Sequence, residues 1–208
     1  MFRCSLPPLI RRHGIAACLA ASMTACSSLP APPLSQVASP AAQQRMQRLA
    51  AVQQFSLQAK LAVQYNGKGY TARLEWQHAA QEDQMRIFSP LGQQVALIHR
   101  TAQSVTLTDQ RGQQHEASDV ASLTERLLGW RLPLAGLSQW VLGIPHPASP
   151  FQASYLDSGE PATLTQDNWQ INYENYQPAT LNSTTEQLPH TTRLQQQDVR
   201  LKLVIQHW

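Results

Sequence analysis

Hydrophobic and polar residues alternate with a period of two from residue 55 onward. Between Phe55 and Tyr65 apolar side chains recur at every second position, which is typical of a β-strand with one buried face. The following Asn66-Gly67 favours a tight hairpin turn, because both residue types tolerate positive φ angles. Residues 70–77 repeat the alternation. The pattern therefore predicts that the folded part of the chain contains a β-hairpin at this point.

Hydrophobic periodicity also predicts further short strands and three helices. The other predicted strands cover residues 85–87, 95–99, 105–108, 113–116, 151–156, 162–165, 169–173, 191–194 and 199–208, with a polar loop over 174–190. Helices are predicted over 40–54, over 119–128 with Ser118 as its N-cap, and from Pro133 to Gly143. About ten antiparallel strands with two or three amphipathic helices predict a mainly β (α+β) fold, in which helices pack on the concave face of a curved sheet.

The first 25 residues have the pattern of a secretory signal peptide. Arg3, Arg11 and Arg12 precede a short apolar run, residues 15–21, which is too short to cross a membrane as a stable helix. Residues 26–39 contain several prolines and no apolar periodicity, and we expect them to form a semi-extended tether. The remaining residues, 40–208, are expected to form a single domain.

The end of the signal peptide carries a possible modification site. Met23-Thr24-Ala25-Cys26 resembles a bacterial lipobox, in which the cysteine receives two acyl chains on sulfur and a third on its amine after cleavage. Cys26 would then anchor the protein to a bilayer. Ser27 follows the cysteine, and by resemblance to sorted lipoproteins it favours the outer membrane over the inner membrane. The alternative is an ordinary signal peptide in which Cys26 is incidental.

Removing residues 1–25 changes the charge balance. Three of the sixteen Lys and Arg residues lie there, and the thirteen acidic residues all lie later, so the mature chain has no net charge. This balance gives no reason to expect a nucleic-acid partner. Cys4 and Cys18 also lie in the signal peptide, so we expect no disulfide in the mature chain and a stability that depends on its packed core.

The mature chain lacks the motifs of the common enzyme classes. Its histidines are scattered, none pairs at the i, i+4 spacing of a metal-binding helix, and no nucleophile elbow, phosphate loop or dinucleotide fingerprint is present. We therefore expect no catalytic residues, metal or cofactor. Ser89-Pro90-Leu91-Gly92 stands apart, because it places an apolar side chain at the tip of a tight turn. A single loop leucine would ordinarily fold back onto the core.

Several motifs together resemble the LolB family of outer-membrane lipoprotein receptors. Ser89-Pro90-Leu91-Gly92 is similar to the Asn-Pro-Leu-Gly loop of that family, with serine in place of asparagine. The family's Pro-Leu and Gln-Trp-Ile-Leu-Gly-Leu-Pro segments are similar to residues 132–134 and 139–145, and three of its strands resemble residues 72–77, 168–173 and 199–208. The likeness runs in unbroken order over about residues 40–208.

The resemblance implies an unclosed antiparallel β-barrel of ten to eleven strands, with helices that cover a concave apolar face around a cavity. It also implies a monomeric receptor at the periplasmic face of the outer membrane, anchored through Cys26. Such a receptor accepts triacylated lipoproteins from a LolA-type periplasmic carrier and inserts them among outer-membrane phospholipids without nucleotide hydrolysis. In this family the leucine that matches Leu91, between Pro90 and Gly92, protrudes into solvent and acts in membrane insertion.

The inward apolar positions outnumber those that a simple sheet-on-helix core requires, and they could either line a cavity or fill the interior. Our hypothesis is that the acyl-chain cavity is formed by Phe55, Leu57, Leu61, Tyr70, Leu74, Trp76, Met85, Ile87, Val95, Leu97, Trp140 and Trp169. Two alternatives stay open. One is a lipid-anchored, lipocalin-like binding module for a small apolar ligand, and the other is an envelope scaffold with a filled interior.

Overall fold

A computed structural model describes residues 37–208, so the predicted signal peptide, Cys26 and most of the predicted tether lie outside the described residues. The helices are α1 (Pro40–Ala50), α2 (Val120–Leu128) and α3 (Leu134–Trp140). The strands are β1 (Gln54–Tyr65), β2 (Lys68–Ala79), β3 (Glu82–Phe88), β4 (Gln94–Arg100), β5 (Val105–Asp109), β6 (Gln114–Ala117), β7 (Phe151–Tyr155), β8 (Pro161–Gln166), β9 (Trp169–Leu181), β10 (Thr184–Gln196) and β11 (Val199–His207).

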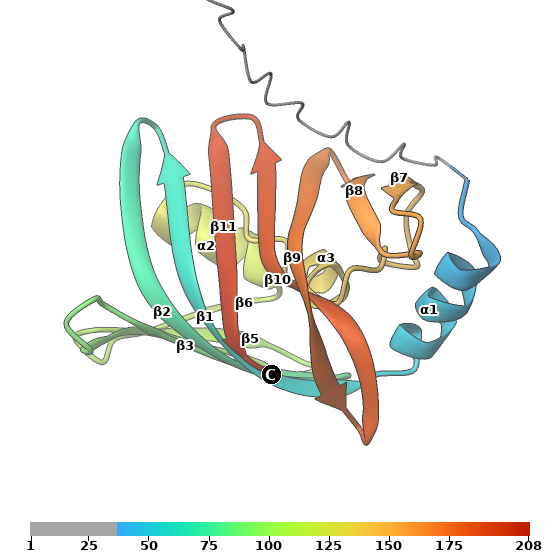
Figure 1. Cartoon of the computed structure of the whole chain (residues 1–208). Helices are drawn as coiled ribbons and strands as arrows, with labels where there is room; N and C mark the ends of the chain where they lie inside the picture. Colours follow the sequence, from blue (N-terminus) through green and yellow to red (C-terminus); the bar gives the residue numbers. More distant parts are fainter. Residues whose placement is uncertain (1–36) are drawn as a thin grey trace, which may run out of the picture. The chain divides into compact units, whose positions relative to one another are not determined.

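All eleven strands form one antiparallel sheet, in the order β6-β5-β4-β3-β2-β1-β11-β10-β9-β8-β7 (Figure 1). β6 and β7 are the two edges, so the barrel is unclosed. The chain passes from one edge to the other through α2 and α3, and these helices therefore cross the concave side of the sheet (Figure 1). The predicted fold class is confirmed.

The first hairpin forms as the alternation predicts. β1 and β2 pair in regular register from Gln54 opposite Ala79 to Tyr65 opposite Lys68. The turn residues Asn66 and Gly67 have φ angles of 49° and 71°, as a tight hairpin requires.

The helix caps agree with the prediction in α1 and differ in α2. The Ser39 hydroxyl accepts a hydrogen bond from the Ala42 backbone N–H at 3.2 Å, but α1 ends at Ala50, before the predicted residue 54. In α2 the cap is Asp119, not Ser118, because the Asp119 carboxylate accepts from the Ser122 N–H at 2.8 Å. This hydrogen bond lowers the pKa of Asp119.

The predicted loop over 174–190 is wrong. β9 continues to Leu181, and β10 returns from Thr184 after a turn at Asn182 and Ser183, both of which have positive φ angles. Most residues of this distal hairpin are polar and many are exposed, so no apolar alternation marks it as a strand.

Candidate functional site

The inner face of the sheet is apolar and covered by the helices. Most of the predicted cavity residues lie there in one hydrophobic core, namely Phe55, Leu57, Leu74, Trp76, Met85, Trp140 and Trp169. Leu61 and Ile87 are half-buried against that core. Trp76 and Trp140 are completely shielded from solvent, so the apolar interior is closed in this structure. An acyl chain can reach this face only if part of the helical cover moves.

Three of the predicted cavity residues lie elsewhere. Leu97 pairs with Arg86 and Thr108 on the convex face, whereas its neighbour Ile98 occupies the inner face. Val95 lies beside the register shift between β3 and β4 and is half-buried outside the core. The run 95–98 is apolar throughout, so its sequence does not specify which side faces inward, and the pairing with β3 decides.

Tyr70 is 60% exposed, although it pairs with the core-side residue Val63. β3 accompanies β2 only from Arg73 onward, so the part of β2 that contains Tyr70 projects beyond its neighbour. The prediction that Tyr70 lies inside the cavity is therefore wrong, and Tyr70 lies at the rim of the sheet.

The helical cover, residues 120–144, is firmly attached on its α3 side. The Trp140 indole N–H donates to the side-chain oxygen of Gln166 at 2.8 Å, and Gln166 also bonds backbone groups of His146 and Ser149. The Arg45 guanidinium of α1 donates to the carbonyls of residues 142 and 143, both at 3.1 Å. These contacts are mostly buried and fix α3 to β8 and to α1.

The α2 side of the cover is held more weakly. We call residues 120–133 the α2 flap. It buries Val120 and Leu123 in the core, but its hydrogen bonds to the sheet are exposed: the Tyr65 hydroxyl donates to the Gly129 carbonyl at 2.7 Å, and Arg126 donates to a β6 carbonyl. Exposed hydrogen bonds contribute little net stability because water competes for the same groups. The α2 flap is therefore the part of the cover that opens at the lower cost.

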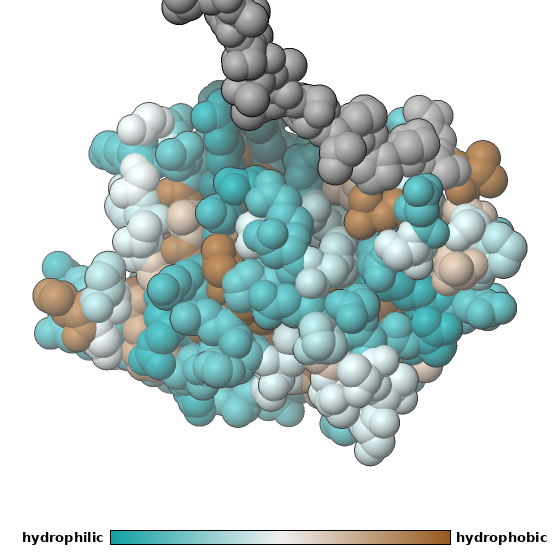
Figure 2. All heavy atoms as spheres, in the orientation of Figure 1, coloured by the Kyte–Doolittle hydropathy of each residue, from teal (hydrophilic) through white to brown (hydrophobic). Residues whose placement is uncertain are grey.

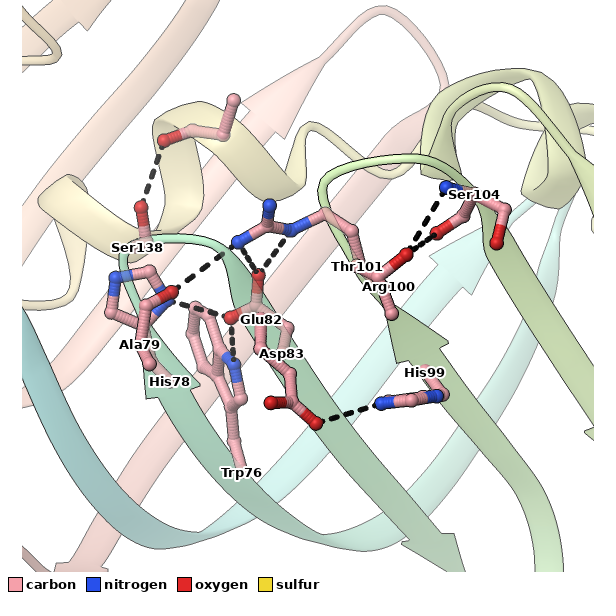
Figure 3. Close-up of polar contacts among 11 residues, drawn as sticks. Trp76, His78, Ala79, Glu82, Asp83, His99, Arg100, Thr101, Ser104 and Ser138 are labelled. Atoms are coloured by element: carbon pink, nitrogen blue, oxygen red, sulfur yellow. Dashed lines mark hydrogen bonds and ion pairs between the residues drawn. The ribbon is translucent and has the colours of Figure 1, made fainter.

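A buried ionic cluster closes the end of the inner face near the β2–β3 turn (Figure 3). Asp83 is 1% exposed, and its carboxylate accepts from the Trp76 indole N–H at 2.8 Å, from His78 at 2.6 Å and from the Arg100 guanidinium. Burial by itself would raise the pKa of Asp83, but these hydrogen bonds together hold it below its ordinary value. The Phe55 ring stacks on His78 with 4.7 Å between the ring centroids. Since Trp76 and His78 belong to β2, Asp83 to β3 and Arg100 to β4, these hydrogen bonds link three strands.

Sequence reasoning missed a second polar region under α1. Arg45 of α1 is 4% exposed, although no buried charge was expected in the helix predicted over 40–54. Its guanidinium lies 5.8 Å above the Tyr176 ring, and burial lowers its pKa. Tyr173 of β9 and Thr192 of β10 are register partners on the inner face, and both are buried. In the sequence, this region is marked only by polar residues, Tyr173 and Thr192, among the apolar positions of the two strands.

Leu91 protrudes from the β3–β4 connection and is 91% exposed, as the resemblance implied. The Gly92 N–H donates to the Ser89 carbonyl at 2.9 Å, and the Ser89 N–H donates to the Gln93 carbonyl at 2.8 Å. Gly92 has a φ of 84°, which a larger residue adopts only with strain. The turn is thus closed by its own backbone, and the Leu91 side chain stays in solvent.

The surface view shows a mostly hydrophilic face with scattered hydrophobic groups (Figure 2). One hydrophobic group lies at the left edge, where Figure 1 shows the end of the β3–β4 hairpin. Within residues 37–208 no helix is long and apolar enough to span a bilayer, and no cluster of three or more metal-ligating side chains occurs.

Comparisons with known proteins point to one family. The family model described as "Outer membrane lipoprotein LolB" matches residues 53–208. The outer-membrane lipoprotein LolB of Nitrosomonas europaea is 34% identical over 154 residues, which cover 74% of this chain and 72% of that protein. That of Thiobacillus denitrificans is 34% identical over 167 residues, or 80% of this chain and 84% of the relative. Among solved structures, a LolA superfamily protein from Nitrosomonas europaea aligns at 10% identity with a TM-score of 0.48, over 82% of this chain and 92% of that one.

Proposed function

Because the chain belongs to the LolB family of outer membrane lipoproteins, we propose that it is a receptor that accepts triacylated lipoproteins from a LolA-type soluble carrier and inserts them into the outer membrane. The observation that carries this proposal is the continuous apolar inner face of the sheet under a cover with one weakly attached side. Such a face can shield acyl chains from water during transfer.

The transfer requires no nucleotide hydrolysis in this proposal. Exposure of an acyl chain to water costs about 25 cal/mol for each Å² of apolar surface, so the chains pass from one apolar site to the next without crossing solvent. Each difference of about 1.4 kcal/mol between donor and acceptor gives a tenfold preference. A receptor that binds the chains more tightly than the carrier, and a bilayer that binds them more tightly still, give the transfer its direction.

Because the interior is closed, the first step of acceptance in this proposal is an opening of the helical cover. Acyl chains enter when the α2 flap lifts from the sheet, while α3 stays fixed by Gln166 and Arg45. The Tyr65–Gly129 and Arg126–Glu116 hydrogen bonds must break, and Gly129, with a φ of 81°, is the residue at the end of α2 where the backbone changes direction. Opening on this side gives acyl chains access to the inner face of the sheet.

Cys26 and Leu91 provide the membrane contacts in this proposal. Cys26 lies outside the described residues, and we propose that it carries three acyl chains. Two chains already give stable anchoring, at about 0.8 kcal/mol per buried methylene. Leu91 then reaches the periplasmic leaflet of the outer membrane and assists release of the cargo into it.

A Leu91→Glu variant tests the proposal. We expect it to take a triacylated lipoprotein from the soluble carrier as the wild type does, but to deliver little of it to outer-membrane vesicles. Phe151→Glu is the matched control, because Phe151 is also exposed, at 42%, but lies on β7 outside the α2 flap, and this variant should accept and deliver as the wild type does. Equal loss of acceptance and delivery in the Leu91 variant contradicts the proposed role. A wild-type protein that binds a free fatty acid but removes no lipoprotein from the carrier is instead the small-ligand binding module.

A further inference from the structure

Two hydroxyl groups on the inner face are buried without a hydrogen-bond partner among residues 37–208. They belong to Tyr173, which is 6% exposed, and Thr192, which is completely buried. The two residues are direct partners in the β9–β10 register, so their side chains lie next to each other on the same face. Thr192 is in turn opposite Leu203 of β11, which pairs with Leu61 of β1. The hydroxyl pair thus adjoins the apolar row of the inner face.

The side chain of Arg45 adjoins this pair. Arg45 approaches from α1, and its charge acts on the Tyr173 hydroxyl, whose pKa burial nevertheless raises well above the ordinary value. The Arg45 Nε–H also lacks a partner, and its other donors bind the carbonyls of residues 142, 143 and 187. Glu160, from the β7–β8 turn, also acts on Arg45, and its Oε2 is a buried acceptor without a hydrogen-bond partner among the described residues.

Two other buried polar residues of the inner face, Gln166 and Asp83, are hydrogen-bonded, whereas Ser149 Oγ and Glu160 Oε2 are buried without a partner elsewhere in residues 37–208. Gln166, 2% exposed, makes four hydrogen bonds, and the Asp83 carboxylate binds three side chains. Buried donors without partners are rare in folded proteins, and each such group calls for an explanation. The polar atoms of Gln166 and Asp83 are thus bonded within the protein, whereas the hydroxyls of Tyr173 and Thr192, on the same inner face, are not.

We propose that Tyr173 and Thr192 bind a carbonyl oxygen of the ester or amide groups that join acyl chains to the cargo's N-terminal cysteine. This inference rests on the proposed function. An ester carbonyl accepts hydrogen bonds and donates none, so it can accept from the unpartnered hydroxyls of Tyr173 and Thr192. The apolar row through Leu203 and Leu61 accommodates the hydrocarbon, and the hydroxyl pair fixes where the polar end of the chain lies. Free fatty alcohols and alkyl ethers lack this carbonyl, so they should gain no affinity from the two hydroxyl groups.

The test compares two synthetic lipopeptides with the same hydrocarbon. One carries a tripalmitoylated cysteine with its two esters, and the other is a diether analogue in which both ester carbonyls are absent. Both are measured by competition with a fluorescent fatty acid. We expect the wild type to prefer the diester about tenfold, the effect of a single hydrogen bond. A third lipopeptide, a diester in which an N-hexadecyl amine replaces the N-palmitoyl amide, separates the sources, because only a contact to the amide carbonyl is lost with it.

Three variants connect the preference to the site. Tyr173→Phe and Thr192→Val remove the hydroxyls, and together they should reduce the diester preference to less than about twofold. Tyr176→Phe is the matched control on the same strand, because its hydroxyl already donates to the Pro161 carbonyl at 2.6 Å. It should keep the full preference. Tyr173→Phe should leave the melting temperature of the lipid-free protein unchanged or higher, whereas Tyr176→Phe should lower it.

The outcomes separate this inference from the proposed function. A wild type that binds all the lipopeptides equally well overturns the carbonyl site and leaves the receptor function intact. A preference that persists in the Tyr173→Phe, Thr192→Val double variant overturns it as well. A wild type that binds none of the lipopeptides contradicts the receptor function itself. The wild-type comparison needs no variant to fold, so the proposal is testable even if the double variant is unstable.

Discussion

Replacement of Gly129 by alanine should loosen the α2 flap without disturbing the rest of the fold. Gly129 has a φ of 81°, a left-handed conformation that costs an alanine about 1 kcal/mol. An added Cβ would also lie 3.1 Å from the Tyr65 ring and 3.3 Å from its hydroxyl. The ring must shift, and its 2.7 Å hydrogen bond to the Gly129 carbonyl weakens, at a further cost of about 0.5 kcal/mol. Both costs are relieved when the flap lifts, so opening should become about tenfold more frequent.

Hydrogen exchange followed by mass spectrometry measures this change. Peptides from residues 120–133 should exchange about tenfold faster in Gly129→Ala, while peptides from 134–149 keep their wild-type rates. Gly112→Ala is the control, because Gly112 has a φ of 78° in the β5–β6 turn and open space around the added Cβ. It carries the same backbone strain without the Tyr65 contact. Uniformly faster exchange across 120–149, or equal effects of the two variants on the flap, would refute an opening confined to α2.

Three further substitutions test the contacts of the core. Asp83→Asn should cost about 3 kcal/mol at pH 7. Because the folded pKa of Asp83 is lowered, the stabilising contribution of its carboxylate is present above about pH 4 and is lost as the pH falls through the folded pKa. Urea unfolding should therefore show a larger loss of stability in Asp83→Asn at pH 7 than at pH 2. Equal losses at the two pH values would contradict the assignment. Gly136→Ala places a Cβ in steric overlap with the Trp140 ring, and a loss of about 2 kcal/mol with an altered near-ultraviolet circular dichroism spectrum is expected; an unchanged spectrum would contradict it. Gln166→Leu leaves buried partners at Trp140 and His146 unsatisfied and should lower the free energy of unfolding by about 3 kcal/mol; a loss below 1 kcal/mol would show that water replaces the amide.

The sequence predicted the elements whose residues differ clearly between the two faces. β1 and β2 alternate strictly, and Asn66-Gly67 favours a tight turn between them, so the hairpin was predicted, and the structure confirms it. Residues 95–98 are apolar at every position, so alternation could not tell Leu97 from Ile98, and only pairing with β3 decides. The distal half of the β9–β10 hairpin was not predicted as strand for the opposite reason: its residues are mostly polar, so neither face is marked as apolar.

The site was predicted only in part, for similar reasons. The exposure of Leu91 followed from the resemblance and not from hydrophobic patterning, since a loop leucine carries no periodic signal. Arg45 lies on the buried side of α1 because carbonyls of residues 142, 143 and 187, distant in sequence, receive its donors. Tyr173 and Thr192 become neighbours through strand pairing. Polar groups buried by tertiary contacts cannot be separated from surface residues by local pattern alone.

The pairing of β1 with β11 has a consequence for how the chain must be made. These two strands join the beginning and the end of the domain at the centre of the sheet, and on either side lie consecutive hairpins, β1 to β6 and β7 to β11. Until β11 has formed, the two halves have no shared seam, and β1 and β10 each keep an unpaired edge. A chain cut short before Val199 would therefore lack the strand that joins the two meanders into one sheet.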